Sequence, residues 1–149
     1  MSPFTFRIHK PSPSEKKRLR ACGMPFSRLK IFAAEEISGQ SGFSIERSRV
    51  LKALSELQEL RSVGPSLATK MIMLGCDSVA SLENSNPSEM YHKLCDILGR
   101  RIDPCVEDVF RCAVAQSKYP NMDEQFGDWW HWTDQRGRAD VPYPKEFQE

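Results

Sequence analysis

The stretch 60-LRSVGPSLA-68 decides the fold that we predict for this chain of 149 residues. Gly64 permits a tight turn, and Pro65 directly after it suits the first turn of a new helix. Apolar residues recur at helical spacing on both sides of this turn, which predicts one helix over 45–60 and a second over 65–74. The apolar positions that define the two faces are Val50, Leu54, Leu57, Leu67, Met71 and Leu74.

The same arrangement recurs further along the chain, after one short helix. The pair Asn86-Pro87 predicts the start of a helix that ends at Gly99, and Asp103-Pro104 repeats this start signal for a last helix. No segment of 44–118 alternates as a strand would. We therefore predict an all-α, SAM-like core of five helices over 44–118, with two helix pairs around a pseudo-two-fold axis as in a double helix-hairpin-helix domain.

The turn at 60–68 resembles the helix-hairpin-helix motif, in which backbone N–H groups of a glycine-containing turn bind a phosphate. Glycine lets these N–H groups approach the phosphate, and the start of the next helix adds free donors and partial positive charge. Ser62 stands where the motif usually has its first glycine, so we expect this departure to require a negative φ. The residues that we expect at this DNA-binding site are Ser62, Val63, Gly64, Ser66, Leu67 and Lys70.

A second turn, Gly99-Arg100-Arg101, offers a glycine and two cations to the same DNA backbone. Contacts to phosphates read no bases, so the binding of double-stranded DNA would be independent of sequence and weakened by salt. The alternative interpretation is a pair of ordinary helix turns, in which Gly64 permits a bend, Pro65 starts a helix and the arginines are solvated.

Charge is distributed unevenly along a chain whose net charge is only +1. Residues 1–30 contain eight Lys and Arg and one Glu, a net charge of +7, and residues 121–149 contain three basic and seven acidic residues, a net charge of −4. We expect a basic, partly flexible arm over 1–43 with a short helix over 26–38. We expect an acidic tail over 119–149 whose tryptophans pack on the core, with base stacking or partner binding as the alternative.

The five cysteines form no CxxC pair, and no apolar run is long enough for a secretory signal or a membrane span. This pattern predicts reduced thiols in the cytoplasm and no membrane partner. Four side chains on the last two helices are weak candidates for a zinc site, and we expect no cofactor. These candidates are His92, Cys95, Cys105 and Cys112.

The chain contains no nucleophile elbow, Walker loop, zinc-protease motif or paired carboxylates, so we do not expect an enzyme. DNA glycosylases also carry a helix-hairpin-helix, with a lysine on its second helix and a catalytic aspartate downstream. Lys70 is such a lysine, and Asp77 and Asp96 lie downstream. The chain is nevertheless short for the two-lobed cleft that base flipping needs.

Three stretches within residues 56–133 resemble the pathogenicity-locus family of small bacterial proteins, which includes proteins labelled as mitomycin-resistance-associated. They are the hairpin 60–75, the stretch 103-DPCVEDVF-110 and the cluster 129-WWHWT-133. The resemblance implies a fold of the DNA-binding type and no defined reaction. We therefore expect an accessory protein that binds DNA without sequence specificity, in DNA repair or a stress response. The alternative is a protein–protein interaction module that binds no nucleic acid.

Overall fold

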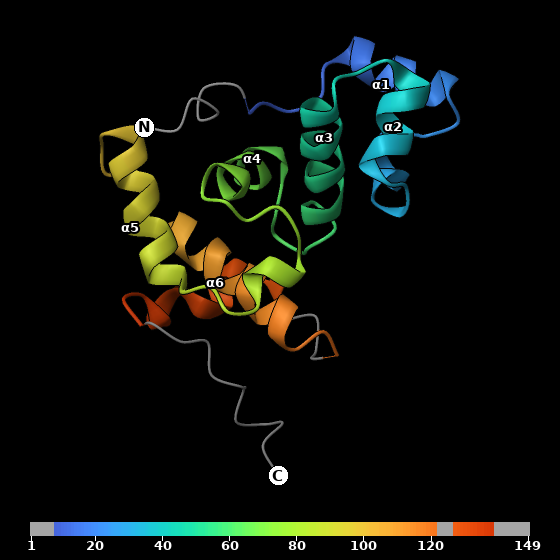
Figure 1. Cartoon of the computed structure of the whole chain (residues 1–149). Coiled ribbons are helices and arrows are strands. Elements are labelled where there is room, and N and C mark those ends of the chain that lie inside the picture. The colour runs from blue at the N-terminus through green and yellow to red at the C-terminus, as the bar shows by residue number, and fades with distance from the viewer. Residues whose placement is uncertain (1–7, 122–126, 139–149) are drawn as a thin grey trace.

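The chain is all-α wherever the computed structural model describes it, over residues 8–121 and 127–138, and no strand occurs in these two ranges (Figure 1). Short 3-10 helices connect or follow the α-helices. The α-helices are α1 (Pro13–Ala21), α2 (Ala34–Ser41), α3 (Ile45–Leu57), α4 (Pro65–Met73), α5 (Pro87–Leu98) and α6 (Cys105–Lys118). The 3-10 helices are η1 (Phe26–Ile31), η2 (Ala80–Leu82) and η4 (Trp129–Gln135).

Capping residues begin and end the central helices close to where the sequence predicts. The side chains of Ser44 and Asn86 accept hydrogen bonds from backbone N–H groups at the starts of α3 and α5, at 3.1 and 3.0 Å. Gly99 ends α5 in the left-handed region that favours glycine, with φ +69°. The carboxylate of Asp103 accepts a hydrogen bond of 2.9 Å from the N–H of Cys105, the first residue of α6.

Helix α6 is the centre of the larger core. Every residue from Val106 to Ala115 is buried. Helix α5 packs along α6, η2 and η4 also contact it, and α3 packs against α4. Both helix pairs that the sequence predicts are therefore present, and their apolar side chains join in one cluster.

Residues 8–43 form a second, smaller helical unit where we expected a basic, partly flexible arm, and residues 1–7 of that arm lie outside the described residues. Elements α1, η1 and α2 bury Leu19, Leu29 and Ile37 completely, and these side chains share a cluster with Leu51 of α3. Burial of this shared apolar surface offsets the entropy cost of ordering the segment. The single helix that we expected over 26–38 is divided into η1 and α2.

A capping box begins α1, and its glutamate also binds α3. The hydroxyl of Ser12 accepts a hydrogen bond from the N–H of Glu15 at 3.1 Å, and the Glu15 carboxylate accepts one from the N–H of Ser12 at 2.9 Å. The same carboxylate binds the Arg47 guanidinium of α3 through two contacts of 2.8 Å. Hydrogen bonding to Arg47 lowers the pKa of Glu15 from 4.5 to about 2, although burial opposes the shift.

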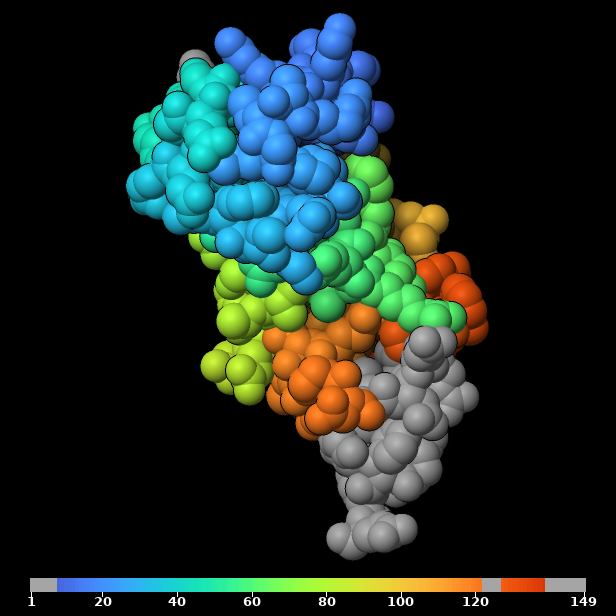
Figure 2. Space-filling view, turned by 90° about the vertical axis from the view of Figure 1, so that its right-hand side faces the viewer, coloured from blue at the N-terminus to red at the C-terminus, as the bar shows by residue number. Residues whose placement is uncertain are grey.

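The two units occupy opposite ends of the molecule. Figure 2 shows the N-terminal helices in blue at one end, with the green hairpin region between them and the orange α6. None of the described helices combines the length and the apolar character that crossing a membrane requires.

Candidate functional site

The hairpin turn between α3 and α4 is anchored in the core by Val63, which is 6% exposed. Ser62 has φ +73°, and among the described residues it is the only non-glycine with a positive φ. The condition of a negative φ, under which we expected the motif to tolerate serine at this position, is therefore not met. Because the left-handed region favours glycine, Ser62 has the backbone conformation that a glycine at this position would adopt without strain.

The side chain of Ser62 binds the C-terminal segment. Its hydroxyl donates a hydrogen bond of 2.7 Å to the carbonyl oxygen of Gly127 and accepts one of 3.2 Å from the N–H of Trp129. Both hydrogen-bonding roles of the hydroxyl are thus in use. A glycine at residue 62 would relieve the backbone but lose this link between residues more than sixty positions apart in the sequence.

The neighbouring Arg61 is held from two sides. The side-chain amide of Gln116 accepts a hydrogen bond from the Arg61 N–H at 2.8 Å and donates one to its carbonyl at 2.9 Å. The Arg61 guanidinium binds the Asp128 carboxylate at 2.6 Å. A Cβ at Gly127 would lie 2.8 Å from Cδ of Arg61, so any other residue at this position would require Arg61 or the segment to shift.

Cys112 completes this contact from the side of α6. It is fully buried, and its thiol donates a hydrogen bond to the Gly127 carbonyl at 2.7 Å. Burial raises the pKa of the Cys112 thiol to about 12, so the sulfur stays protonated and acts as a donor. Cys112 therefore has a structural role in positioning the C-terminal segment.

The candidate zinc site is not assembled. No three His, Cys, Asp or Glu side chains of the described residues lie close enough together to hold a metal ion. Cys112 faces Gly127, whereas His92 and Cys95 line a pocket on α5. Cys105 lies at the start of α6, where burial and the nearby Asp103 raise the pKa of its thiol.

The start of α4 exposes the backbone donors that the sequence predicts for phosphate binding. Gly64 and Ser66 are exposed and Leu67 is half-buried, and no described residue accepts a hydrogen bond from their N–H groups. Gly64 has φ −95° and ψ −174°, which any residue adopts, and a Cβ there would meet nothing within 4 Å. The Lys70 ammonium donates to the hydroxyl of Ser66 at 2.9 Å and thus lies beside these donors.

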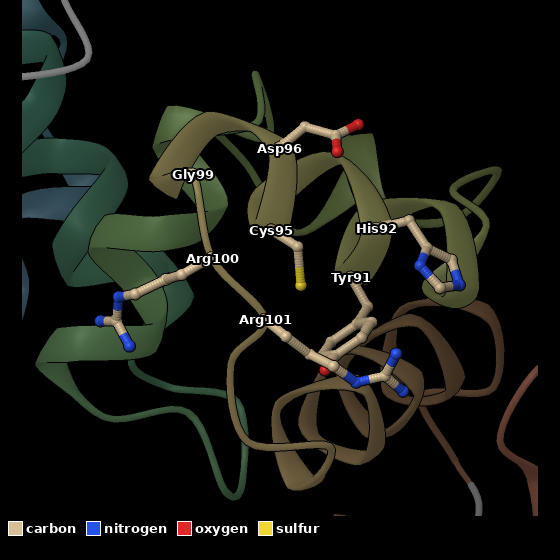
Figure 3. Close-up of a pocket in the computed structure, with 7 residues that line it drawn as sticks. All are labelled: Tyr91, His92, Cys95, Asp96, Gly99, Arg100 and Arg101. Carbon is tan, nitrogen blue, oxygen red and sulfur yellow. The ribbon is translucent and has the colours of Figure 1, made fainter.

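The second predicted turn forms a separate pocket of about 360 Å³ at the end of α5 (Figure 3). Its lining includes Cys95, Gly99 and both arginines but no residue of the hairpin turn. Figure 3 shows Arg101 reaching across Tyr91, whereas Arg100 points away from it on the other side of the chain. Both arginines are exposed, and no described carboxylate pairs with either of them.

Buried charges on α6 were absent from our sequence predictions. Asp108 is completely buried and accepts hydrogen bonds from Nε and Nη2 of Arg136, at 2.9 and 2.6 Å. Glu107 accepts hydrogen bonds from Arg111 at 2.9 Å and from the N–H of Gly137 at 2.7 Å. These buried charges join α6 to the residues after η4, and charged residues inside an otherwise apolar helix were the available signal.

The tryptophan cluster divides between packing and exposure. Trp132 is 4% exposed and belongs to the larger core, and Trp129 packs partly against it, as we predicted. Trp130 is 61% exposed, contrary to that prediction. The hairpin, α6 and the tryptophan cluster, which are the three stretches that carry the family resemblance, therefore meet in one place.

The three stretches lie within the region that comparison with known proteins matches. The sequence model of the family described as Pathogenicity locus matches residues 51–138, from within α3 to the end of the described C-terminal segment. The mitomycin resistance protein McrB of Streptomyces lavendulae is 34% identical over 85 residues, which cover 56% of this chain and 76% of that protein. No solved structure matches the chain. Because the family match covers more than half of its residues, the chain belongs to the pathogenicity locus family.

Proposed function

We propose that this protein binds double-stranded DNA without sequence specificity, with the hairpin between α3 and α4 acting as the first half of a double helix-hairpin-helix domain. The supporting observation is the exposed start of α4, where three backbone N–H groups lack described partners. The Lys70 ammonium lies beside them, and open space surrounds Gly64. Helix starts of this kind are suited to anions because the free donors and the helix dipole favour negative charge.

In this proposal, one phosphate lies against the N–H groups of Gly64, Ser66 and Leu67, with Lys70 adding charge. The exposed Arg100 and Arg101 contact further phosphates from the second turn. A total of about three or four phosphates predicts a slope near −3 when log affinity is plotted against log salt concentration. These contacts position a DNA backbone and contain no group aimed at base edges.

We propose an accessory role, without catalysis, in DNA repair or a stress response of a bacterial cytoplasm. The relative from Streptomyces lavendulae is named for resistance to mitomycin, which supports a setting of chemical stress. Asp77 and Asp96, the aspartates that a glycosylase mechanism would draw on, line two different cavities. The geometry therefore supports binding better than base excision.

The substitution Gly64→Asp tests the proposal sharply. Gly64 is the N-cap residue of α4, and aspartate is a favoured N-cap because its carboxylate accepts hydrogen bonds from the following N–H groups. The variant should therefore keep or raise the melting temperature, while its carboxylate occupies and repels the site of the phosphate. We expect a loss of duplex affinity of at least about tenfold in titrations at two salt concentrations.

Gly39→Asp is the matched control, because Gly39 is exposed on α2 and a Cβ there also meets nothing within 4 Å. It makes the same change in charge far from the hairpin and should leave duplex affinity unchanged. Unchanged binding by the Gly64→Asp protein, or no binding by the parent protein at low salt, would exclude the proposal.

The alternative function, a protein-interaction module, draws on one feature. An open groove of about 1290 Å³ lies among α2, α3 and α4, and Val50, Ile72 and Met73 contribute half-buried apolar surface to it. An apolar groove beside helices can receive a partner helix. Under this alternative, Val50→Asp would abolish partner binding, and no DNA affinity would be measured for any variant.

A further inference from the structure

Trp130 presents an exposed indole on η4. It is 61% exposed, and Ile31 is the other large hydrophobic residue that is exposed among the described residues. Trp130 lies on η4 directly after Trp129, whose backbone N–H donates a hydrogen bond to the hydroxyl of Ser62 in the hairpin turn. The exposed indole is therefore attached to the turn that we propose binds phosphate.

The segment that carries Trp130 is joined to the turn by several contacts. Two further contacts join the segment before Trp130 to the turn, namely Ser62 to the carbonyl of Gly127 at 2.7 Å and Arg61 to Asp128 at 2.6 Å. The rings of Trp129 and Trp130 meet edge to face, with centroids 5.8 Å apart and planes at 82°. Because Trp129 packs on the core, it holds the indole of Trp130 against the body of the protein while most of that ring faces solvent.

We propose that Trp130 stacks on an unpaired base of single-stranded DNA whose backbone is bound at the start of α4. This inference rests on the proposed function and adds DNA with unpaired bases to the ligands of the same site. A base inside a duplex is already stacked on both faces, so an exposed indole gains contact area only from a base that is unpaired. Every base has a flat face that can stack on an indole. The stacking therefore distinguishes single strands from duplexes but does not distinguish one base sequence from another.

The distances permit one strand to reach both places. Ser62 and Gly64 are two residues apart, so their Cα atoms lie within about 7 Å of each other. Trp130 directly follows Trp129, whose backbone N–H is hydrogen-bonded to Ser62. This separation fits within the span of about four nucleotides that is usual for the smallest single-strand sites. The Asp128 carboxylate, two residues before Trp130 in the chain, is paired with Arg61, which reduces its repulsion of the DNA backbone.

The surroundings of Trp130 fit a base better than a protein partner. His131, Thr133 and Asp134, which follow it closely in the chain, are exposed and polar, so these neighbours do not extend the apolar surface of the indole. A stable protein interface needs a contiguous contact of about 800 Å² on each partner, whereas a base needs one ring.

The test measures the affinity of the full chain for a labelled single strand of twelve thymidines and for a duplex of twelve base pairs, by fluorescence anisotropy at one salt concentration. The variants are Trp130→Ala, Trp130→Phe and the control Ile31→Ala, which removes the other exposed hydrophobic side chain. We expect Trp130→Ala to weaken single-strand binding about tenfold and duplex binding less than twofold. Trp130→Phe should keep most of the single-strand affinity, and Ile31→Ala should keep all of it.

The two proposals fail in different ways. Equal loss on both ligands in Trp130→Ala, or no loss on either, overturns the stacking inference and leaves duplex binding by the hairpin in place. If the parent protein binds neither ligand, the proposed function itself fails. Because Trp130 is exposed, Trp130→Ala should melt at the temperature of the parent protein, and this measurement separates lost stacking from lost folding.

Discussion

Ser62 contributes to the stability of the hairpin turn with two opposite signs. Its left-handed backbone costs about 1 kcal/mol relative to glycine, while its hydroxyl makes two hydrogen bonds to the C-terminal segment. Hydrogen bonds of this kind contribute about 1 kcal/mol each. The side chain therefore compensates at long range for the strain that it causes locally.

Substitutions at Ser62 separate these two contributions. Ser62→Ala keeps the strain and loses both hydrogen bonds, so we expect it to lower the free energy of unfolding by about 2 kcal/mol. Ser62→Gly also loses the bonds but relieves the strain, so its loss should be smaller by about 1 kcal/mol. Urea denaturation measures both values, and a glycine variant less stable than the alanine variant would contradict this interpretation.

Among the helices, α3 to α6 were predictable because their signals are local. Asn86 with Pro87, and Gly99 at the other end, mark the limits of α5 within the sequence itself. The contacts of α6 were not predictable, because Asp108 is neutralised by Arg136, a residue that no local pattern joins to it. Likewise, no pattern around Ser62 reveals that its hydroxyl binds residues 127–129. The hairpin part of the predicted phosphate site lies on contiguous residues of one turn, whereas the exposure of Trp130 depends on how a distant segment docks.

Helix α1 shows how charge can conceal structure. Its lysines and arginines indicated a flexible arm, although Ser12 and Glu15 already formed the pattern of a capping box. Burial of Leu19 and the pairing of Glu15 with Arg47 then fix the helix on the neighbouring unit. In this segment the capping box therefore indicated the helix correctly, whereas the positive charge wrongly indicated disorder.

Acid should weaken the attachment of α1 to α3. The pKa of Glu15 is about 2 in the folded protein against an ordinary value of 4.5, so its contribution is present above pH 5 and lost as pH falls toward 2. Because solvent screens this pair in part, we expect a loss of about 1–2 kcal/mol. Urea denaturation between pH 6 and 2.5 should show a shallower decline for Glu15→Gln than for the parent protein, and parallel curves would contradict the assignment.

At the scale of the whole molecule, the family match and the structure divide the chain differently. The match begins at residue 51, so α1, η1, α2 and the first turns of α3 lie outside it. Leu51 nevertheless belongs to the smaller apolar cluster together with Leu19 and Ile37. The N-terminal unit therefore lies outside the matched region but packs against it.

Removal of residues 1–23 tests this integration. The shortened chain would begin at Met24, which is 2% exposed, and would lose the completely buried Leu19. We expect its free energy of unfolding to fall by at least about 3 kcal/mol, from lost apolar burial and the lost Glu15–Arg47 pair. Thermal unfolding by circular dichroism measures the change.

The double substitution Lys16→Gln with Lys17→Gln is the control, because it removes charge from α1 while both side chains remain exposed in the parent protein. Its stability should stay within about 0.5 kcal/mol of the parent value. A shortened chain as stable as the parent would show that α1 adds nothing to the packing of the molecule.

The close approach of Gly127 to Arg61 couples the residues that can be accepted at these two positions, which lie far apart in the sequence. A Cβ on residue 127 would lie 2.9 Å from Cβ of Arg61 and 2.8 Å from its Cδ, so a side chain there displaces the turn unless residue 61 changes too. Homologous chains should therefore show covariation between these two positions. Because of this close contact, the hairpin and the C-terminal segment together determine the shape of the turn. They therefore also determine the direction of the N–H donors at the start of α4.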